Sequence, residues 1–362
     1  MTPNRRNFLK TFGLTALATQ FPPIAQQEPS PTPQSQPSSI TILKPPRLKT
    51  GDTVGLVSPA GYIDRQDIDD IKKALTPLGL KVKLGTHILD RYGYLAGTDA
   101  NRAADLNAMF ADSSVQAILP MRGGWGCNRI LPYLDYSLIR SHPKILMGLS
   151  DITSLIIAIY AKSGVVTFHG ATGQSTWNPF TIDYVKRILF NGEVLTLQHQ
   201  LNRDTNLTNN LVRRETITPG KVRGKLIGGN LSVLTAMLGS DYLPTWQGTI
   251  LFVEEIKEEI YRVDRMLNQL KLAGILEQVS GFIFGQCTDC DRLTRESNAK
   301  DGQESLTLTQ VLRDHIQPLG IPAWSGAMIG HIQNKFTLPI GVDVQIDANQ
   351  GTIQLLETAV TS

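Results

Sequence analysis

The sequence predicts an α/β protein of two domains. Short apolar strands alternate with amphipathic helices up to residue 170, an order typical of a parallel sheet covered by helices on both faces. A polar stretch at 196–220, rich in Asn, Thr and Arg, then interrupts the pattern and indicates an interdomain linker. Strands and helices return at 221–358, which we interpret as a smaller α+β domain.

The N-terminal domain, expected at 47–195, contains four strand-and-helix units in order. Strands are expected at 53–58, 81–84, 115–120 and 145–148, and helices at 63–78, 98–111, 127–134 and from 150 onward. The helix from Thr98 begins with a residue that typically caps a helix N-terminus.

The C-terminal domain begins with a glycine-rich segment at 224–232. Strands are expected at 249–253, 279–284, 323–329, 342–346 and 352–355, and helices at 260–272 and 308–316. Glu254 and Glu255 end the first of these strands.

The first 46 residues precede the folded part. Asn4-Arg5-Arg6-Asn7-Phe8-Leu9-Lys10 matches a twin-arginine pattern, and an uncharged, mildly apolar stretch follows. We expect residues 1–25 to be a twin-arginine export signal, which places the protein in the periplasm without a stable membrane anchor. The Pro/Ser/Gln tract at 26–46 cannot form a core and is expected to be a linker.

Composition excludes several classes of function. The signal carries three basic residues, and its removal leaves 32 of the 35 Lys and Arg against 32 acidic residues. A nucleic-acid partner is not expected, because such proteins need a clustered basic face. The six histidines lack metal-binding spacing, so we expect no metal and no cofactor. Cys287 and Cys290 are expected to be free thiols, with a disulfide as the alternative.

The run from Lys144 to Tyr160 has the layout of a nucleophile elbow. A strand ends at Gly148, Ser150 stands at the corner, and a helix begins at once. In an elbow, a tight turn presents the serine hydroxyl at the edge of the sheet. A serine at this junction is also typical of a helix cap, and Ile152 replaces the second glycine of Gly-x-Ser-x-Gly. Ser150 is therefore a candidate nucleophile, with the helix cap as the alternative.

The glycine loop at 122–126 supports the nucleophile. It follows a strand expected beside the one that ends at Gly148, and glycines let backbone N–H groups approach a developing oxyanion. The N–H of Asp151 would be a second donor. The alternatives are a simple turn or a phosphate-binding loop, although the lysine and hydroxyl residue of a P-loop are absent.

A general base would have to be a histidine. His331, which follows Gly330, is the favoured candidate, and His169 is its competitor. Glu254 is the candidate acid because active-site groups gather at the C-terminal ends of strands in α/β proteins. Spacing alone does not separate it from Glu255.

Several ordered motifs resemble those of the LD-carboxypeptidases, including the microcin-immunity branch of that family. The motifs are Arg122-Gly123-Gly124-Trp125-Gly126, Gly148-Leu149-Ser150-Asp151-Ile152-Thr153, Gly228-Gly229-Asn230-Leu231, Leu251-Phe252-Val253-Glu254-Glu255, Tyr261-Arg262-Val263-Asp264-Arg265-Met266-Leu267 and Gly330-His331. The resemblance covers residues 48 to 346, nearly the whole mature chain. It implies a glutamine-amidotransferase-like (flavodoxin-like) N-terminal domain, a C-terminal swivelling domain and a homodimer.

The resemblance also implies a serine peptidase with a Ser-His-Glu triad. Ser150 would be the nucleophile, His331 the general base and Glu254 the acid that orients the imidazole. The N–H groups of Gly124 and Asp151 would form the oxyanion hole.

The substrate that the resemblance implies is the murein tetrapeptide, cut between meso-diaminopimelate and the terminal D-alanine. Arg122 is a candidate for the substrate carboxylate, by its place beside the glycine loop, and Trp125 stands at the mouth of the site. Two alternatives remain: a microcin-type amidase that acts on aminoacyl-nucleotide analogues, and a periplasmic ligand-binding protein without catalytic activity.

Overall fold

Two sheets organise the computed structural model, which describes residues 41–198, 214–291, 294–296 and 305–362. The first sheet has the strand order β12-β5-β4-β3-β1-β2. Its strands are β1 (Thr53–Val57), β2 (Lys81–Leu84), β3 (Ala117–Pro120), β4 (Ile145–Gly148), β5 (Phe168–His169) and β12 (Leu338–Pro339). The first five are parallel, and β12 pairs antiparallel with β5. The predicted parallel-sheet domain is confirmed.

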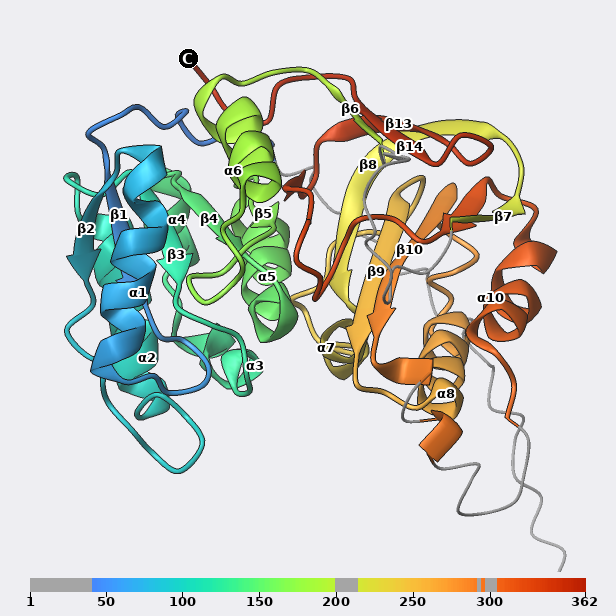
Figure 1. The fold of residues 1–362 in the computed structure, drawn as a ribbon, viewed down its shortest axis with the longest axis horizontal. Helices are drawn as coiled ribbons and strands as arrows, with labels where there is room; N and C mark the ends of the chain where they lie inside the picture. Colours follow the sequence, from blue (N-terminus) through green and yellow to red (C-terminus); the bar gives the residue numbers. More distant parts are fainter. Residues whose placement is uncertain (1–40, 199–213, 292–293, 297–304) are drawn as a thin grey trace, which may run out of the picture. The chain divides into compact units, whose positions relative to one another are not determined.

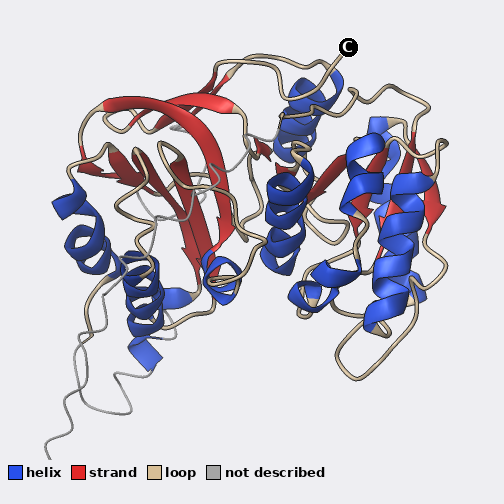
Figure 2. Cartoon of the chain, turned by 180° about the vertical axis from the view of Figure 1, so that it is seen from behind, coloured by secondary structure: helices blue, strands red, loops and turns tan. Residues whose placement is uncertain are grey.

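Helices surround the first sheet. They are α1 (Arg65–Leu75), α2 (Asp99–Ala111), α3 (Cys127–Ile130), α4 (Tyr136–Ser141), α5 (Thr153–Ser163) and α6 (Pro179–Val185), with short turns η1 (Thr76–Leu78), η2 (Leu131–Tyr133), η3 (Ser150–Ile152) and η4 (Lys186–Phe190). Figure 1 shows α1 in front of the strands, and Figure 2 shows that helices also cover them from behind. Thr98 caps α2 by accepting a hydrogen bond from the N–H of Asn101, as the sequence indicates.

The second sheet is mixed, with the order β6-β14-β13-β8-β9-β10-β11-β7. Its strands are β6 (Thr196–Gln198), β7 (Glu215–Thr218), β8 (Lys221–Asn230), β9 (Ile250–Ile256), β10 (Gly281–Thr288), β11 (Ala323–Ser325), β13 (Asp343–Asp347) and β14 (Thr352–Leu355). The central strands β8 to β11 run parallel, and the outer strands pair antiparallel. Beside this sheet lie α7 (Leu231–Ala236), α8 (Ile260–Leu272), α10 (Leu308–Ile316) and η5 (Gln317–Leu319) (Figure 1). The second domain that the sequence predicts is therefore built on a sheet as well, with helices beside it.

The two sheets are joined through α5 and through the end of the chain. Helix α5 is almost wholly buried because it packs against β4 and β5 on one side and β8 on the other. After β11 the chain returns to the first sheet, where it adds β12. Residues 326–337 therefore lead from β11, next to one edge of the second sheet, to β12 at an edge of the first sheet.

Several predicted boundaries differ from the structure. The linker predicted at 196–220 contains β6 and β7, which are edge strands and need few apolar residues. The helix predicted at 127–134 ends at Ile130, and a 3₁₀ turn containing Pro132 follows. Strand β9 continues to Ile256, so Glu254 and Glu255 lie within it. The predicted export signal lies outside the described residues.

The expectation of free thiols at Cys287 and Cys290 is wrong, because a disulfide joins them. Cys287 lies near the end of β10, and the next turn places Asp289 at a φ of 64°. This left-handed residue reverses the chain and brings the two Cα atoms to 5.5 Å, a separation typical of disulfides. Cys127 is free and buried.

The described residues contain no group of His, Cys, Asp and Glu that is arranged to hold a metal ion. Among the same residues, no helix has the length and apolar character that crossing a membrane requires.

Candidate active site

A pocket of about 830 Å³ lies where both sheets end, at the C-terminal ends of their parallel strands. Ser150 follows β4, Asn230 ends β8, Glu255 is near the end of β9, and His331 follows β11. All four residues line the pocket. The carboxyl ends of parallel strands are where α/β proteins bind ligands, and here two sheets contribute to one pocket.

Ser150 has the backbone conformation of a nucleophile elbow. Its φ is 63°, in the left-handed region that residues other than glycine rarely adopt. Among the described residues only Lys257 and Asp289 share this property without being glycine. Neither η3 nor α5 has a side-chain cap. The helix-cap interpretation of Ser150 is therefore wrong, and the strained turn holds the serine at the pocket wall.

The glycine loop packs directly on Ser150. A Cβ atom at Gly123 would lie 2.8 Å from the Cβ of Ser150 and 2.9 Å from its Oγ, so only glycine fits there. Gly124, with a φ of 133°, packs instead against the backbone of Gly61. Within the described residues, the backbone N–H groups of Gly124 and Asp151 donate to no protein acceptor. The two segments that meet at Ser150, the glycine loop and η3, thus each contain one free backbone N–H donor.

The carboxylate of Asp151 has a structural contact of its own. It is buried and accepts a 2.8 Å hydrogen bond from the N–H of Cys127, the first residue of α3. Burial raises the pKa of this carboxyl group, and the bond from Cys127 opposes the rise. The side chain therefore fixes the glycine loop to the elbow, while the N–H remains available.

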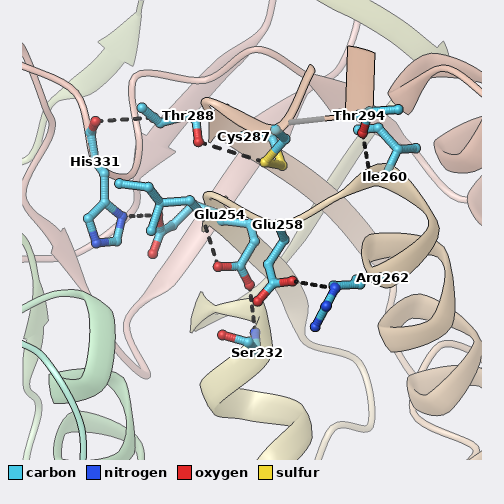
Figure 3. Close-up of a disulfide and its surroundings, with 12 residues drawn as sticks. Ser232, Glu254, Glu258, Ile260, Arg262, Cys287, Thr288, Thr294 and His331 are labelled. Carbon is cyan, nitrogen blue, oxygen red and sulfur yellow. Dashed lines mark hydrogen bonds and ion pairs between the residues drawn. A yellow bond between two sulfur atoms is a disulfide. The ribbon is translucent and has the colours of Figure 1, made fainter. Parts of the chain in front are cut away.

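His331 and Glu254 form a hydrogen-bonded pair. Nδ1 of His331 lies 2.8 Å from Oε2 of Glu254 (Figure 3), and the carboxylate is completely buried. Burial favours the neutral carboxyl group, but the adjacent His331 outweighs it and lowers the pKa of Glu254. Burial alone would also lower the pKa of His331, but the charge of Glu254 raises it above its ordinary value. The pairing separates Glu254 from Glu255, which the sequence could not do.

Glu255 belongs to a different network. Its carboxylate accepts hydrogen bonds from Nδ2 of Asn230 at 3.0 Å and from the N–H groups of Ser232 and Ile256. Burial and the neighbouring Glu254 charge raise its pKa to about 7. Asn230 also caps α7, so this network connects the ends of β8 and β9 beneath the pocket. Asn230 belongs to the motif Gly228-Gly229-Asn230-Leu231, but its role could not be predicted from sequence; its place at a strand end was the available signal.

His169, the competing histidine, is unsuited to be the base. It is 1% exposed, lies edge-on to Phe252, and neither ring nitrogen has a partner among the described residues. Burial lowers its pKa to about 4. It does not line the pocket, whereas His331 does.

Ser150 and His331 line the same pocket but are not hydrogen-bonded to each other. The ring nitrogen that remains is Nε2, because Nδ1 is bonded to Glu254.

Arg122 and Trp125 also line the pocket. Arg122 is half-buried, and its Nε donates to the carbonyl of Gly123 at 3.3 Å. Trp125 is 61% exposed and packs edge-on against Tyr94, so it stands at the rim. A third residue, Lys335, lines the pocket and was missed because it lies in a loop with no motif around it.

The disulfide lies behind the histidine loop (Figure 3). Oγ1 of Thr288, between the two cysteines, donates to the carbonyl of His331 at 3.1 Å. The carbonyl of Thr288 accepts a 2.8 Å bond from the N–H of Lys257. The bridged turn therefore contacts both the histidine loop and the end of β9.

Comparison with family models decides the family. Residues 54–170 match the LD-carboxypeptidase N-terminal domain, and residues 223–346 match the LD-carboxypeptidase C-terminal domain. The chain belongs to the LD-carboxypeptidase family. This LD-carboxypeptidase is a serine carboxypeptidase, so a ligand-binding protein without activity is excluded.

Relatives of this LD-carboxypeptidase include cell-wall and microcin-immunity proteins. It is 41% identical to the probable murein peptide carboxypeptidase of Bacillus subtilis, with 85% of this chain and 93% of the relative covered. It is 28% identical to the murein tetrapeptide carboxypeptidase of Pseudomonas aeruginosa, with 87% and 98% covered.

The third relative is the microcin C7 self-immunity protein MccF of Escherichia coli, which is 29% identical, with 86% and 94% covered. A solved structure of MccF in complex with glutamyl sulfamoyl guanosine superposes with a TM-score of 0.77. That comparison covers 88% of this chain and 100% of the solved chain, at 27% identity.

Proposed function

We propose that this LD-carboxypeptidase hydrolyses the bond between meso-diaminopimelate and the terminal D-alanine of murein tetrapeptides. The observation that carries the proposal is one pocket lined by a strained serine and by a histidine bonded to a buried carboxylate. The relatives from Bacillus subtilis and Pseudomonas aeruginosa support the substrate, since both are described as murein peptide carboxypeptidases.

In this proposal Ser150, His331 and Glu254 form the catalytic triad. Oγ of Ser150 attacks the carbonyl carbon at the L-centre of diaminopimelate, and Nε2 of His331 accepts the hydroxyl proton. The tetrahedral intermediate then breaks its C–N bond, and Nε2 returns the proton to the amine of D-alanine. Water attacks the resulting ester by the same route and frees Ser150. Glu254 keeps Nδ1 protonated and stabilises the imidazolium.

The oxyanion hole in this proposal consists of the N–H groups of Gly124 and Asp151. Their lack of protein acceptors among the described residues supports the assignment. Each such donor contributes about 3 kcal/mol to stabilising the transition state. Trp125 at the rim would contact the peptide stem, and Arg122, on the side of the glycine loop, would meet a carboxylate of the acyl part of the substrate.

The second candidate is an amidase for aminoacyl-nucleotide analogues. The superposition on MccF with glutamyl sulfamoyl guanosine favours it, because that ligand joins an acidic amino acid to a nucleoside. The two candidates share the same serine chemistry and differ in the acyl group that Ser150 would receive and in the leaving group.

A substrate panel separates the two candidates. Purified protein is incubated with diaminopimelate tetrapeptide, the matching tripeptide and aspartyl sulfamoyl adenosine, and the products are separated by liquid chromatography. The proposal expects D-alanine and tripeptide from the tetrapeptide, and a much lower kcat/KM for the nucleotide analogue. Rapid cleavage of the analogue without D-alanine release would support the amidase instead.

We also propose export by the twin-arginine route to the periplasm. The Cys287–Cys290 disulfide supports an oxidising compartment. Replacing Arg5 and Arg6 by lysine should retain the protein in the cytoplasmic fraction after osmotic shock, and periplasmic recovery of that variant would oppose the proposal. A homodimer remains our expectation, and analytical ultracentrifugation tests it.

A further inference from the structure

The proposed reaction requires a cation beside His331. A carboxypeptidase must recognise the free carboxylate of the C-terminal residue that it releases. In D-alanine this carboxylate and the amine are attached to the same carbon, and Nε2 of His331 must reach that amine to protonate it. The group that binds the carboxylate must therefore lie on the histidine side of the pocket.

Three cationic side chains line the described pocket: Arg122, Lys257 and Lys335. Lys257 is exposed at the rim. Arg122 packs on Gly123, which touches Ser150, so it lies on the side of the glycine loop. This side faces the oxyanion and the acyl part of the substrate rather than the leaving group.

Lys335 lies on the histidine side. It is four residues beyond His331 in the segment that connects the two sheets, and it is close enough to Glu254 and His331 to influence both charges. The residue is only 5% exposed, yet it borders the pocket. Its position is fixed locally, because the N–H of the next residue, Phe336, donates to the carbonyl of Met328 at 2.9 Å.

Among the described residues, the ammonium group of Lys335 has no hydrogen-bond or ion-pair partner. Glu254, the nearby carboxylate, is bonded to His331 instead. A buried charge without a partner is costly unless a ligand supplies one. Burial lowers the pKa of Lys335 to about 8, so the group still carries its charge at neutral pH.

We propose that Lys335 binds the terminal α-carboxylate of the departing D-alanine. This inference rests on the proposed function and adds the residue that makes the enzyme a carboxypeptidase rather than an endopeptidase. It moves carboxylate recognition from Arg122, the residue favoured by sequence, to a lysine on the leaving-group side.

The test compares two substrates that differ only at this carboxylate. One is the tetrapeptide with a free terminal D-alanine, and the other is its C-terminal amide, which releases D-alaninamide. We expect the unmodified protein to prefer the free acid by about 100-fold in kcat/KM, the scale of one desolvated charge pair. In Lys335→Met the preference should fall below about fivefold, mainly through a higher KM for the acid.

Two further variants separate the explanations. Lys335→Arg should keep a clear preference for the acid, and Arg122→Gln should retain the full preference. If Lys335 acted only through His331, then Lys335→Met would slow acid and amide equally and would shift the pH profile. The rate at which a fluorophosphonate labels Ser150 reports whether each variant keeps a folded, reactive site.

The possible outcomes are distinct. If the unmodified protein releases neither D-alanine nor D-alaninamide, the proposed function fails and the Lys335 assignment fails with it. If D-alanine is released but Lys335→Met, labelled at the normal rate, keeps its preference for the acid, only the Lys335 assignment is overturned. Loss of the preference in Arg122→Gln alone would return the role to Arg122.

Discussion

Nδ1 of His331 and Oε2 of Glu254 are 2.8 Å apart, although 77 residues separate them in the chain. The carboxylate comes from the interior of β9 and the imidazole from the loop after β11. Ser150 approaches the same pocket from the first sheet. The site therefore exists only where the two sheets are assembled together.

Replacing Glu254 by Gln should lower kcat/KM by about 10⁴-fold, the effect of replacing the orienting acid of a serine triad by its amide. The amide cannot hold the tautomer or stabilise the imidazolium as the carboxylate does. D-alanine release measured under second-order conditions checks this value. Glu193→Gln, which removes a surface pair with Arg187, is the matched control and should keep normal activity. Equal rates in the two variants would contradict the role of Glu254.

The pH dependence of kcat/KM should have an acidic limb with a midpoint above the ordinary pKa of histidine. The base must be neutral to accept the serine proton, and Glu254 raises the pKa of His331 above its ordinary value. Activity is thus lost as the pH falls through this raised pKa. In Glu254→Gln the limb should move to lower pH, because the charge that chiefly raises the pKa of His331 is lost. Burial and the nearby Lys335 still lower this pKa, although Glu255 opposes them. If the midpoint of the acidic limb does not change in Glu254→Gln, a group other than His331 is responsible for the limb.

Gly123→Ala should lower kcat/KM by about 100-fold or more, since displacement of a reacting group by about 1 Å has this effect. The new methyl group would lie 2.8 Å from the Cβ of Ser150 and push this side chain from its place. Gly239→Ala is the contrasting control: its φ is 82° and no atom lies within 4 Å. It should lower stability by about 1 kcal/mol through backbone strain, with unchanged activity. Full activity of Gly123→Ala would refute the packing argument.

Reduction of the Cys287–Cys290 bridge should reduce both stability and activity. The closed loop is short, so the expected loss of unfolding free energy is about 2 kcal/mol. Thr288 in this turn also donates a hydrogen bond to the carbonyl of His331. Loss of this contact on reduction of the bridge should lower kcat/KM by about tenfold. Chemical denaturation and kinetics of oxidised protein and of Cys290→Ser measure both effects. Thr288→Val, which keeps the bridge and removes the donor, isolates the contact with His331.

Residues with strong local signals could be predicted from sequence. Helices at 260–272 and 308–316 have the expected bounds because their apolar residues recur with helical spacing, and a capping box at Thr307 begins the second helix. The elbow at Ser150 was visible for a similar reason: an apolar strand, a small residue and a helix follow one another.

Features that depend on distant contacts could not be predicted. Glu254 and Glu255 are neighbours in a central strand, and only the pairing with His331 and Asn230 separates their roles. The disulfide depends on the left-handed turn at Asp289, which has no signature. Lys335 is one lysine among many until the fold places it beside the histidine.

The most direct test of the account is D-alanine release from murein tetrapeptide by Ser150→Ala, compared with the unmodified protein. Ser137→Ala, an exposed serine on α4, serves as the matched control. The account predicts that Ser150→Ala falls below about 10⁻³ of the normal rate and loses its fluorophosphonate adduct by mass spectrometry, while the control keeps both. Undiminished D-alanine release by Ser150→Ala would contradict the assignment of Ser150 as the nucleophile.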